Sequence, residues 1–206
     1  MFIYYLGHAC MKICNRKYSV LFDPYEPGSV PGLPDLKAQA TRVLSSHGHH
    51  DHDWIDGVEV LSPIGPAFKI TEIKSYHDDR QGALRGENTI HVVEADGLRI
   101  VHMGDQGCMP TDEQFELIGQ PDCIMIPVGG HYTVDAAAAK AICDRCGARV
   151  IIPMHYRGDG FGYDVIAPVS EFEKLFPKGF VREYDSDTLE LTKDTPPHVA
   201  VLTSKK

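Results

Sequence analysis

The sequence predicts a mixed α/β fold in which strands first form a meander and later alternate with helices. Three observations support this prediction. Short apolar runs separated by turn residues fill the start of the chain, an Asp-Gly turn lies near its middle, and helical patterns separate buried strands in its second half. The 206 residues suffice for one substantial core, and no repeat or linker divides them, so we expect a single domain over residues 1–206.

The elements expected in the first half are short strands. They cover residues 2–6, 10–14, 19–22, 42–44, 58–61 and 68–76. Gly7 and Asn15 separate the first three, because both residues tolerate turn conformations. A Pro- and Gly-rich connection follows over residues 24–34. Residues 35–40 are expected to form a brief helical piece.

The elements expected in the second half are strands and helices in alternation. Strands are expected over residues 89–94, 98–103, 123–127, 150–153, 181–184 and 188–191, and helices over 111–118, 134–146 and 169–176. Asp96-Gly97 between two apolar runs predicts a hairpin. Thr133 is expected to cap the second helix and Gly147 to end it. The polar loop over residues 80–87 is expected to be mobile, and the tail from Lys193 to be loosely held.

Charge and composition disfavour several classes of protein. The formal net charge of -9 argues against a polyanion as the main partner, since phosphate backbones are bound by clustered Lys and Arg. No apolar run approaches the roughly 20 residues of a membrane helix, and the N-terminus lacks a signal pattern, so a cytoplasmic location is expected. The six cysteines are then expected to be free thiols, and Cys143-x-x-Cys146 lacks a second pair to complete a zinc ribbon.

A cluster of four histidines and one aspartate follows the apolar pair Val43-Leu44. Its side chains read His-x-His-x-Asp-His, from His47 and His49 to Asp51 and His52. Imidazole and carboxylate suit zinc, iron and manganese, and alternate residues of an extended segment point the same way. His47 and His49 can therefore converge on one ion, while Asp51 and His52 can reach a second. A solvated histidine-rich loop is the alternative, but the ordered spacing after a strand favours metal binding.

Three more candidate ligands follow apolar runs in the same way. His77 comes after the run that ends at Tyr76, Asp105 after Met103, and His155 after Pro153. Taken singly, such a histidine is more often a hydrogen-bonded core or surface residue. Because sites gather at the carboxyl ends of strands in sheets covered by helices, the repeated placement favours one shared metal site.

The order of these motifs resembles that of metallo-β-lactamase-fold hydrolases, and within them the branch of L-ascorbate-6-phosphate lactonase-like proteins and uncharacterised Zn-dependent hydrolases. The resemblance covers nearly the whole chain. Besides the ligand candidates, it rests on Tyr5-Leu6-Gly7-His8-Ala9, Leu21-Phe22-Asp23-Pro24, Met103-Gly104-Asp105, residues 127–133 and Pro153-Met154-His155-Tyr156. It implies a four-layer αββα sandwich of the α/β (α+β) class, with two sheets face to face, helices outside and a dinuclear metal site along one edge.

The resemblance also implies how seven side chains would divide between two ions. The first ion would be bound by His47, His49 and His77, the second by Asp51, His52 and His155, and Asp105 would bridge the two. Zinc is the first expectation, with Mn²⁺ or Fe²⁺ as alternatives. An aspartate bridge is like that of the general hydrolases of this fold, and histidine at position 49, where the di-iron oxygen reductases have glutamate, disfavours redox chemistry.

The chemistry expected is hydrolysis by a metal-activated hydroxide, since bound zinc lowers the pKa of water from about 15.7 to near 7. Asp51 is expected to orient the nucleophile and accept its proton. His131, after a Gly-Gly turn, is a candidate proton donor or oxyanion binder, with a merely structural turn residue as the alternative. Arg80 and Arg85 are candidates for binding a substrate phosphate or carboxylate, although solvated loop charges explain them as well.

Other histidines receive smaller roles. His8 is expected to be structural or to support the ligands, and His50 to face the protein. No role is expected for His91, His102 and His198.

The leading hypothesis is a dinuclear zinc hydrolase that acts on a small anionic ester, lactone or phosphodiester. One alternative is a nuclease related to tRNA 3′-end processing enzymes, which share the ligand set, but net acidity disfavours a nucleic-acid partner. The other alternative is a non-catalytic metal-binding module. A small anionic molecule is the expected partner, no membrane association is expected, and a homo-oligomer is an open option.

Overall fold

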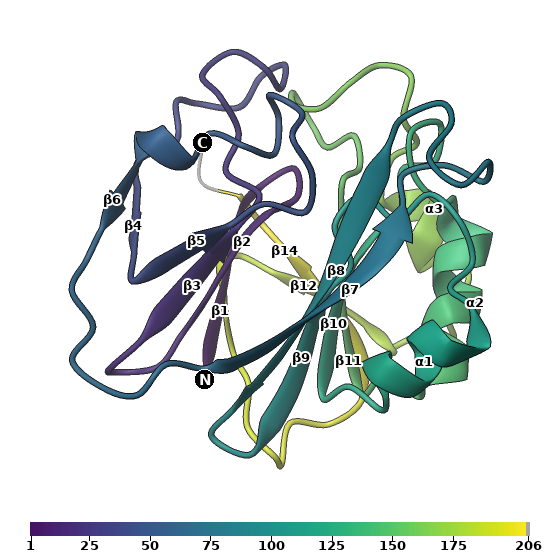
Figure 1. The fold of residues 1–206 in the computed structure, drawn as a ribbon. Coiled ribbons are helices and arrows are strands. Elements are labelled where there is room, and N and C mark those ends of the chain that lie inside the picture. The colour runs from purple at the N-terminus through teal and green to yellow at the C-terminus, as the bar shows by residue number, and fades with distance from the viewer. Residues whose placement is uncertain (205–206) are drawn as a thin grey trace.

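The computed structural model describes residues 1–204 and contains two large sheets that pack face to face (Figure 1). The first sheet has five strands in the order β13-β1-β2-β3-β5. Its strands are β1 (Phe2–Gly7), β2 (Cys10–Cys14), β3 (Ser19–Phe22), β5 (Arg42–Leu44) and β13 (Thr188–Glu190). The expected mixed α/β arrangement of two stacked sheets is confirmed.

The second sheet has seven strands in the order β12-β14-β11-β10-β9-β8-β7. Its strands are β7 (Lys69–Tyr76), β8 (Glu87–Ala95), β9 (Leu98–His102), β10 (Cys123–Pro127), β11 (Val150–Met154), β12 (Val181–Tyr184) and β14 (His198–Leu202). β9, β10 and β11 are parallel, and β7 runs in the same direction because two antiparallel pairings separate it from β9. The carboxyl ends of these four strands therefore meet at one edge.

Three helices cover the outer face of the seven-stranded sheet, at the right in Figure 1. They are α1 (Asp112–Ile118), α2 (Ala136–Cys146) and α3 (Ser170–Glu173). A capping box between Thr111 and Gln114 begins α1. The N-cap of α2 is Asp135, whose side chain accepts from the backbone N–H of Ala138, so the expectation that Thr133 would cap this helix is wrong.

The outer face of the five-stranded sheet carries no long helix in the described part of the chain. It is covered by a parallel strand pair, β4 (Ala38–Ala40) and β6 (Val58–Val60), and by a 3₁₀ turn, η1 (Ile55–Gly57). The helical piece expected over residues 35–40 is therefore wrong. Leu21 and Tyr25 pack with Ala40 and Val58 in a small second core on this face, because every residue of β3 is buried.

The main core lies between the two sheets and under the helices. β1 shows why the sheets stack, since its residues alternate between buried and half-buried, and Ile3 and Tyr5 point into the core. Phe22 from the first sheet meets His91 and His102 from the second, with ring centroids 5.4 and 5.0 Å apart.

Two expectations about the C-terminal part are wrong. β14 lies between β11 and β12 inside the seven-stranded sheet, so most of the tail after Lys193 is firmly held. β13 pairs with β1 in the five-stranded sheet, which carries the chain across the sandwich. The helix expected over residues 169–176 is shorter, with α-helical geometry over Ser170–Glu173.

The cysteines behave as the sequence predicts. All six cysteines are free, and Cys143 and Cys146 lie buried on α2. No helix within residues 1–204 is long and apolar enough to cross a membrane.

Candidate metal centre

Strand ends from both sheets bring the predicted side chains together at one edge. Asp105, just beyond β9, is 2% exposed and lies at the centre. Its Oδ2 atom is 3.2 Å from His52 Nε2, 3.2 Å from His77 Nε2 and 3.1 Å from His155 Nε2. His52 follows β5 in the first sheet, whereas His77 and His155 follow β7 and β11 in the second. The site therefore spans the seam between the sheets.

Gly104 allows Asp105 to reach this central position. Its φ of +57° lies in the left-handed region, and a Cβ atom here would stand 2.4 Å from both Asn88 Oδ1 and Ser46 Cβ. Asn88 Oδ1 also accepts the backbone N–H of Asp105 at 2.9 Å. Only glycine lets the strand end approach Ser46, the neighbour of His47, this closely.

The candidate ligands divide into two halves that differ in burial. One half joins His47, His49 and His77, of which His49 is exposed. The other half joins Asp51, His52 and His155 together with His8, and its three histidines are buried. Within each half the ligand atoms lie within 4.8 Å of one another, and His47, His52 and Asp105 form a third such group between the halves. All seven side chains predicted as ligands thus lie in this site.

A buried carboxylate from the first sheet orients two of these histidines. Asp23 Oδ2 accepts from His52 Nδ1 at 2.9 Å and from the Ser46 hydroxyl at 2.7 Å, and its Oδ1 accepts the Ser46 backbone N–H at 2.6 Å. The Ser46 hydroxyl oxygen in turn accepts from His47 Nδ1 at 2.9 Å. This pattern puts the proton of each imidazole on Nδ1 and leaves Nε2 as a lone pair for a metal ion.

The atoms left over in the site fit a metal ion. His47 Nε2, His52 Nε2 and Asp105 Oδ1 are buried and have no hydrogen-bond partner. Buried polar atoms are normally satisfied, so three unpartnered donor atoms close together fit the binding of a cation. Nitrogen and oxygen donors in this number suit zinc and similar divalent ions.

The electrostatics of the site also favour a cation. Burial would raise the pKa of the Asp105 carboxyl, but His155 and His52 hold it well below its usual range. Burial would lower the pKa of His52, but Asp105 and Asp23 raise it well above its usual value, so without metal this ring holds a proton between two carboxylates. Burial, followed by the charge of His52, lowers the pKa of His47 to about 3, which keeps that imidazole neutral.

Asp51 is held by two groups that face the buried half. Its Oδ2 atom lies 3.2 Å from His8 Nε2 and 3.1 Å from the hydroxyl of Tyr163, which donates also toward the Ser29 carbonyl at 2.8 Å. Burial would raise the pKa of Asp51, but the hydrogen bond from His8 and the charge of His52 lower it, so the carboxylate is ionised.

A pocket of about 270 Å³ opens onto the centre. It is lined by His49, Asp51, His77, Arg85, Asp105, Tyr132, His155 and Tyr163. Arg85 is its one cationic side chain, and its guanidinium lies 5.6 Å from the centroid of the Tyr132 ring. The two tyrosines pack edge to face with centroids 5.9 Å apart, so the mouth is aromatic and positively charged.

The loop that carries Arg85 is built on one buried carboxylate. Asp78 Oδ1 accepts the backbone N–H groups of Arg80 and Gly82 at 2.7 and 3.0 Å, and Oδ2 accepts those of Leu84 and Arg85 at 2.9 and 2.8 Å. These bonds give residues 80–86 a defined shape, in contrast to the mobile loop expected. Arg85 points to the metal pocket, whereas Arg80 is exposed and does not line it.

His131 and His50 lie outside the metal pocket. His131 is exposed, has a φ of +57°, and lines an adjoining hollow of about 410 Å³ that shares Arg85 and Tyr132 with the pocket. Tyr132 is the residue of that turn which lines the metal pocket itself. The His50 side chain is 87% exposed, so the expectation that it faces the protein is wrong.

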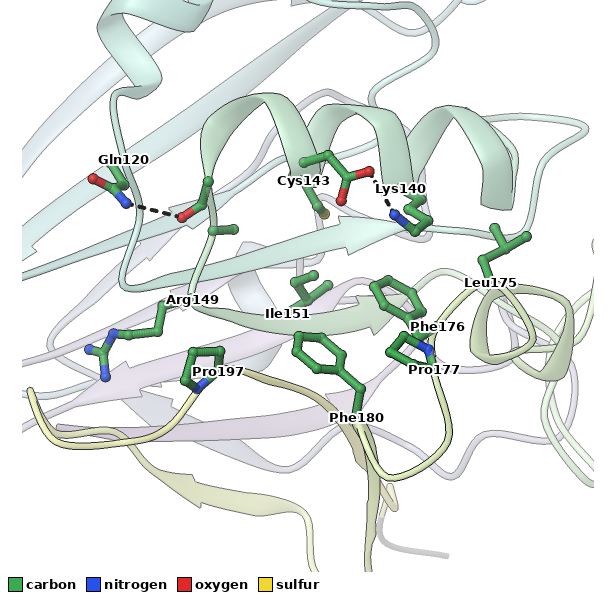
Figure 2. Close-up of a pocket in the computed structure, with 13 residues that line it drawn as sticks. Gln120, Lys140, Cys143, Arg149, Ile151, Leu175, Phe176, Pro177, Phe180 and Pro197 are labelled. Carbon is green, nitrogen blue, oxygen red and sulfur yellow. Dashed lines mark hydrogen bonds and ion pairs between the residues drawn. The ribbon is translucent and has the colours of Figure 1, made fainter.

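A second hollow, of about 610 Å³, lies beside α2 and contrasts with this pocket (Figure 2). Ile151, Phe176 and Phe180 line it, and its charged groups are already paired. Lys140 Nζ lies 2.6 Å from Asp144, and Arg149 binds Asp122 at 2.7 Å. It is larger than the metal pocket but holds no set of converging donors, so chemistry rather than size identifies the site.

Three residues of the site received no role from the sequence. Asp23 stood in a recognised motif, and its place at a strand end was a usable signal. Tyr132 and Tyr163 are ordinary tyrosines in glycine-rich turns, and only the fold brings their rings to the pocket. The proximity of His8 to Asp51 likewise depends on how the sheets stack.

Comparison with known proteins agrees with this geometry. Residues 2–155 match the model of the β-lactamase superfamily domain. A UPF0173 metal-dependent hydrolase from Methanoregula boonei is 31% identical, and the match covers 76% of this chain and 82% of that protein. A protein from Thermotoga maritima, assigned to the Zn-dependent hydrolases of the metallo-β-lactamase superfamily, superposes with a TM-score of 0.77 at 28% identity, with 99% of each chain covered.

The chain thus belongs to the β-lactamase superfamily. Within it, the sequence is homologous to the UPF0173 metal-dependent hydrolases, and the protein is a metal-dependent hydrolase. The metallo-β-lactamase type of fold expected from the sequence is confirmed, with helices on the outer face of the seven-stranded sheet and the β4–β6 pair with η1 on that of the five-stranded sheet.

Proposed function

We propose that the protein is a dinuclear zinc hydrolase that acts on a small anionic ester, lactone or phosphodiester. The observation that supports this proposal most is the pair of adjoining donor groups, one exposed and one buried, with Asp105 Oδ2 within 3.2 Å of histidines from both. His47, His49 and His77 would hold one ion, and Asp51, His52 and His155 the other. Mn²⁺ and Fe²⁺ suit the same donors.

The ions, when bound, would make hydroxide available at neutral pH and polarise the oxygen of the scissile group. Asp51 is ionised and borders the pocket, so it can orient the attacking water and accept its proton. The neutral hydroxyl of Tyr163 beside it limits the directions in which this carboxylate can turn. Proton donation to the leaving group by His131 stays a prediction, since that side chain lines the adjoining hollow.

Arg85 is the group we assign to the substrate's anionic part. A planar guanidinium binds phosphate or carboxylate through two parallel hydrogen bonds. The pocket volume of about 270 Å³ lies below the roughly 300–1,000 Å³ of typical ligand pockets, which favours a compact molecule. Arg80 does not line this pocket, so the Arg80 variant serves as the control for the Arg85 variant.

The experiment that tests the proposal measures metal and turnover together. The protein is stripped with a chelator, reloaded with zinc, and assayed on a generic phosphodiester, a panel of lactones and simple esters. We expect two ions per chain and hydrolysis that disappears with chelator and returns with zinc. Two bound ions without turnover on any of these substrates would instead support a non-catalytic metal-binding module.

The nuclease alternative makes a different prediction. An enzyme of the tRNA 3′-end processing kind would bind RNA with an affinity that falls steeply with salt. The net charge of -9 and the compact pocket favour the small-molecule substrate. The cytoplasmic location and the homo-oligomer considered from the sequence stay predictions.

A further inference from the structure

The turn between β1 and β2 reaches across the sandwich into the buried half of the metal centre. Gly7 and His8 both have a positive φ, +114° and +54°. The His8 carbonyl accepts the backbone N–H of His155 at 2.9 Å, and the Ala9 carbonyl accepts from His102 Nε2 at 2.9 Å. Two hydrogen bonds to the other sheet thus fix the backbone that carries His8. A non-glycine residue in this conformation is uncommon and indicates a specific demand on its side chain.

The His8 imidazole lies among the donors of the buried half. Its side chain is fully buried, and Nε2 is 3.2 Å from Asp51 Oδ2. Its ring centroid is 4.0 Å from that of His155 and 5.2 Å from that of His52. The ligand atoms of these four residues lie within 4.8 Å of one another. Zn–N and Zn–O bonds of about 2.0–2.2 Å put tetrahedral ligands roughly 3.3 Å apart, so a modest contraction of this set encloses an ion.

We propose that His8 is a fourth side-chain donor to the ion in the buried half. This inference rests on the proposed function in one respect, namely that the site holds two ions. Counting the shared Asp105, the buried half would have five protein donors, while the half made by His47, His49 and His77 would have four. Zinc takes four ligands in structural sites and four or five in catalytic ones, so the buried ion would have fewer positions left for water or substrate.

The two ions would therefore be unequal. His8, Asp51, His52 and His155 would enclose the ion that is held more tightly. The half with the exposed His49 would hold an ion with a position open to the pocket, and that ion would supply the activated water. Of the buried set, Asp51 and His155 line the pocket, whereas His8 and His52 are not among its lining residues.

The competing explanation is that His8 only donates a hydrogen bond to Asp51. The substitution His8→Asn separates the two explanations. Asparagine tolerates a positive φ, and its amide is a weak ligand for zinc. Its amide nitrogen ends at the place of ring Nδ1, so H8N also removes the contact with Asp51. Loss of that supporting hydrogen bond alone predicts a change in affinity of about 10–100-fold, smaller than the loss of a ligand. His50→Asn is the matched control, since His50 is exposed and lies outside the donor groups.

The test counts ions. Wild type, H8N and H50N are loaded with zinc, dialysed against a weak chelator and analysed for metal per chain by mass spectrometry. We expect two ions in wild type and H50N and one in H8N, with at least about 100-fold weaker retention of the lost ion. In cobalt-loaded protein, the visible absorption of one of the two ions should change in H8N and stay unchanged in H50N. Two ions in H8N, with wild-type affinities and spectrum, would reduce His8 to a positioning residue and overturn the proposal.

Two controls keep the result interpretable. If H8N does not fold, His8→Gly fits the same backbone conformation without a side chain, and the same ion count applies. The test counts ions and does not measure turnover, so failure of the His8 proposal can be told apart from failure of the proposed hydrolase function. A wild type that holds two ions but hydrolyses nothing contradicts the proposed reaction, whereas equal ion counts in wild type and H8N contradict only the role of His8.

Discussion

Histidines in two regions of this molecule differ in what their nitrogen atoms contact. In the interior, His102 donates from Nε2 to the Ala9 carbonyl at 2.9 Å and accepts the Gly104 N–H on Nδ1 at 3.1 Å. His198 is also satisfied at both nitrogens, by the Pro196 carbonyl and the Tyr184 hydroxyl, each at 2.8 Å. At the strand-end edge, His47 and His52 are anchored through Nδ1. Their Nε2 atoms have no hydrogen-bond partner, and that of His52 faces Asp105 Oδ2 at 3.2 Å.

The difference shows that residue type and burial do not distinguish a metal ligand from a core histidine. His52 and His102 are both fully buried at 0% exposure. What separates them is whether the protein supplies a partner for the second ring nitrogen. In the interior, His91 Nδ1 also lacks a hydrogen-bond partner, so a metal site is indicated by several unpartnered donor atoms at one place rather than by one such atom.

The largest effect should come from removing the central carboxylate. Asp105→Asn keeps the shape but places a neutral amide within reach of three histidines. We expect metal retention and turnover to fall by more than about 100-fold, beyond the range seen for groups that only support a ligand. Asp159→Asn, an exposed carboxylate away from the site, is the control for charge. Full metal content in D105N would mean that the edge does not depend on this carboxylate.

The second prediction concerns the buried His91, whose pKa should make the stability of the fold depend on pH. Burial and the nearby His102 lower the pKa of His91 to about 4 from a usual value of 6.5. Between pH 6.5 and 4, His91 is protonated in the unfolded chain but stays neutral in the folded chain. Its contribution to the free energy of unfolding is therefore complete above pH 6.5 and is lost as the pH falls toward 4. With 1.36 kcal/mol per pKa unit, the loss approaches roughly 3 kcal/mol.

Urea unfolding of metal-free wild type and His91→Leu at pH 7 and near pH 4.5 measures this effect. The variant should lose less stability between the two pH values, because its buried position carries no titrating ring. Metal-free protein is used so that release of ions from the edge does not contribute. Equal losses in both proteins would show that His91 is not a neutral core histidine.

A smaller effect should follow from removing the charge of Asp23, the carboxylate that hydrogen-bonds to His52 and Ser46. Asp23→Asn removes the negative charge that holds His52 directly and His47 through Ser46. We expect metal affinity to fall by about 10–100-fold, less than for D105N, because the ligands themselves remain. Competition with a coloured chelator measures the affinity. An unchanged metal affinity in D23N would mean that the ligand side chains keep their positions without the hydrogen bonds to Asp23.

The smallest effect concerns the substrate rather than the metal. Arg85→Ala should raise KM for an anionic substrate by about 10-fold and leave metal content unchanged, since it removes a charged hydrogen-bond donor at the pocket mouth. Arg80→Ala is the matched control from the same loop and should leave KM as it is. Equal effects of both substitutions would assign them to the general charge of the loop.

The sequence predicted much of this architecture because the informative signals were local. The period of the apolar runs located nearly all strands, and the Asp-Gly turn located the β8–β9 hairpin, where Asp96 and Gly97 have φ values of +51° and +73°. The spacing of His47, His49, Asp51 and His52 predicted side chains that do lie together. That these side chains bind metal remains a prediction that the ion counts above test.

The misses were non-local. The sequence predicted a loose tail where β14 lies, because β14 is held by hydrogen bonds to β11 and β12, which are not its neighbours in sequence. β4 was read as a helical piece because its partner β6 lies far along the chain. Tyr163 is 112 residues from Asp51, and nothing near it in the sequence indicates that its hydroxyl lies beside that carboxylate.

The origin of the ligands in both sheets has a mechanical consequence. His47 and His52 follow the first sheet, and His77, Asp105 and His155 follow the second, so ions held between them would act as a clasp across the sandwich. A ligand that binds only the folded state adds stability in proportion to the logarithm of its concentration over Kd, about 2.7 kcal/mol at 100 times Kd. Cellular metal supply would then regulate the lifetime of the folded protein as well as its turnover.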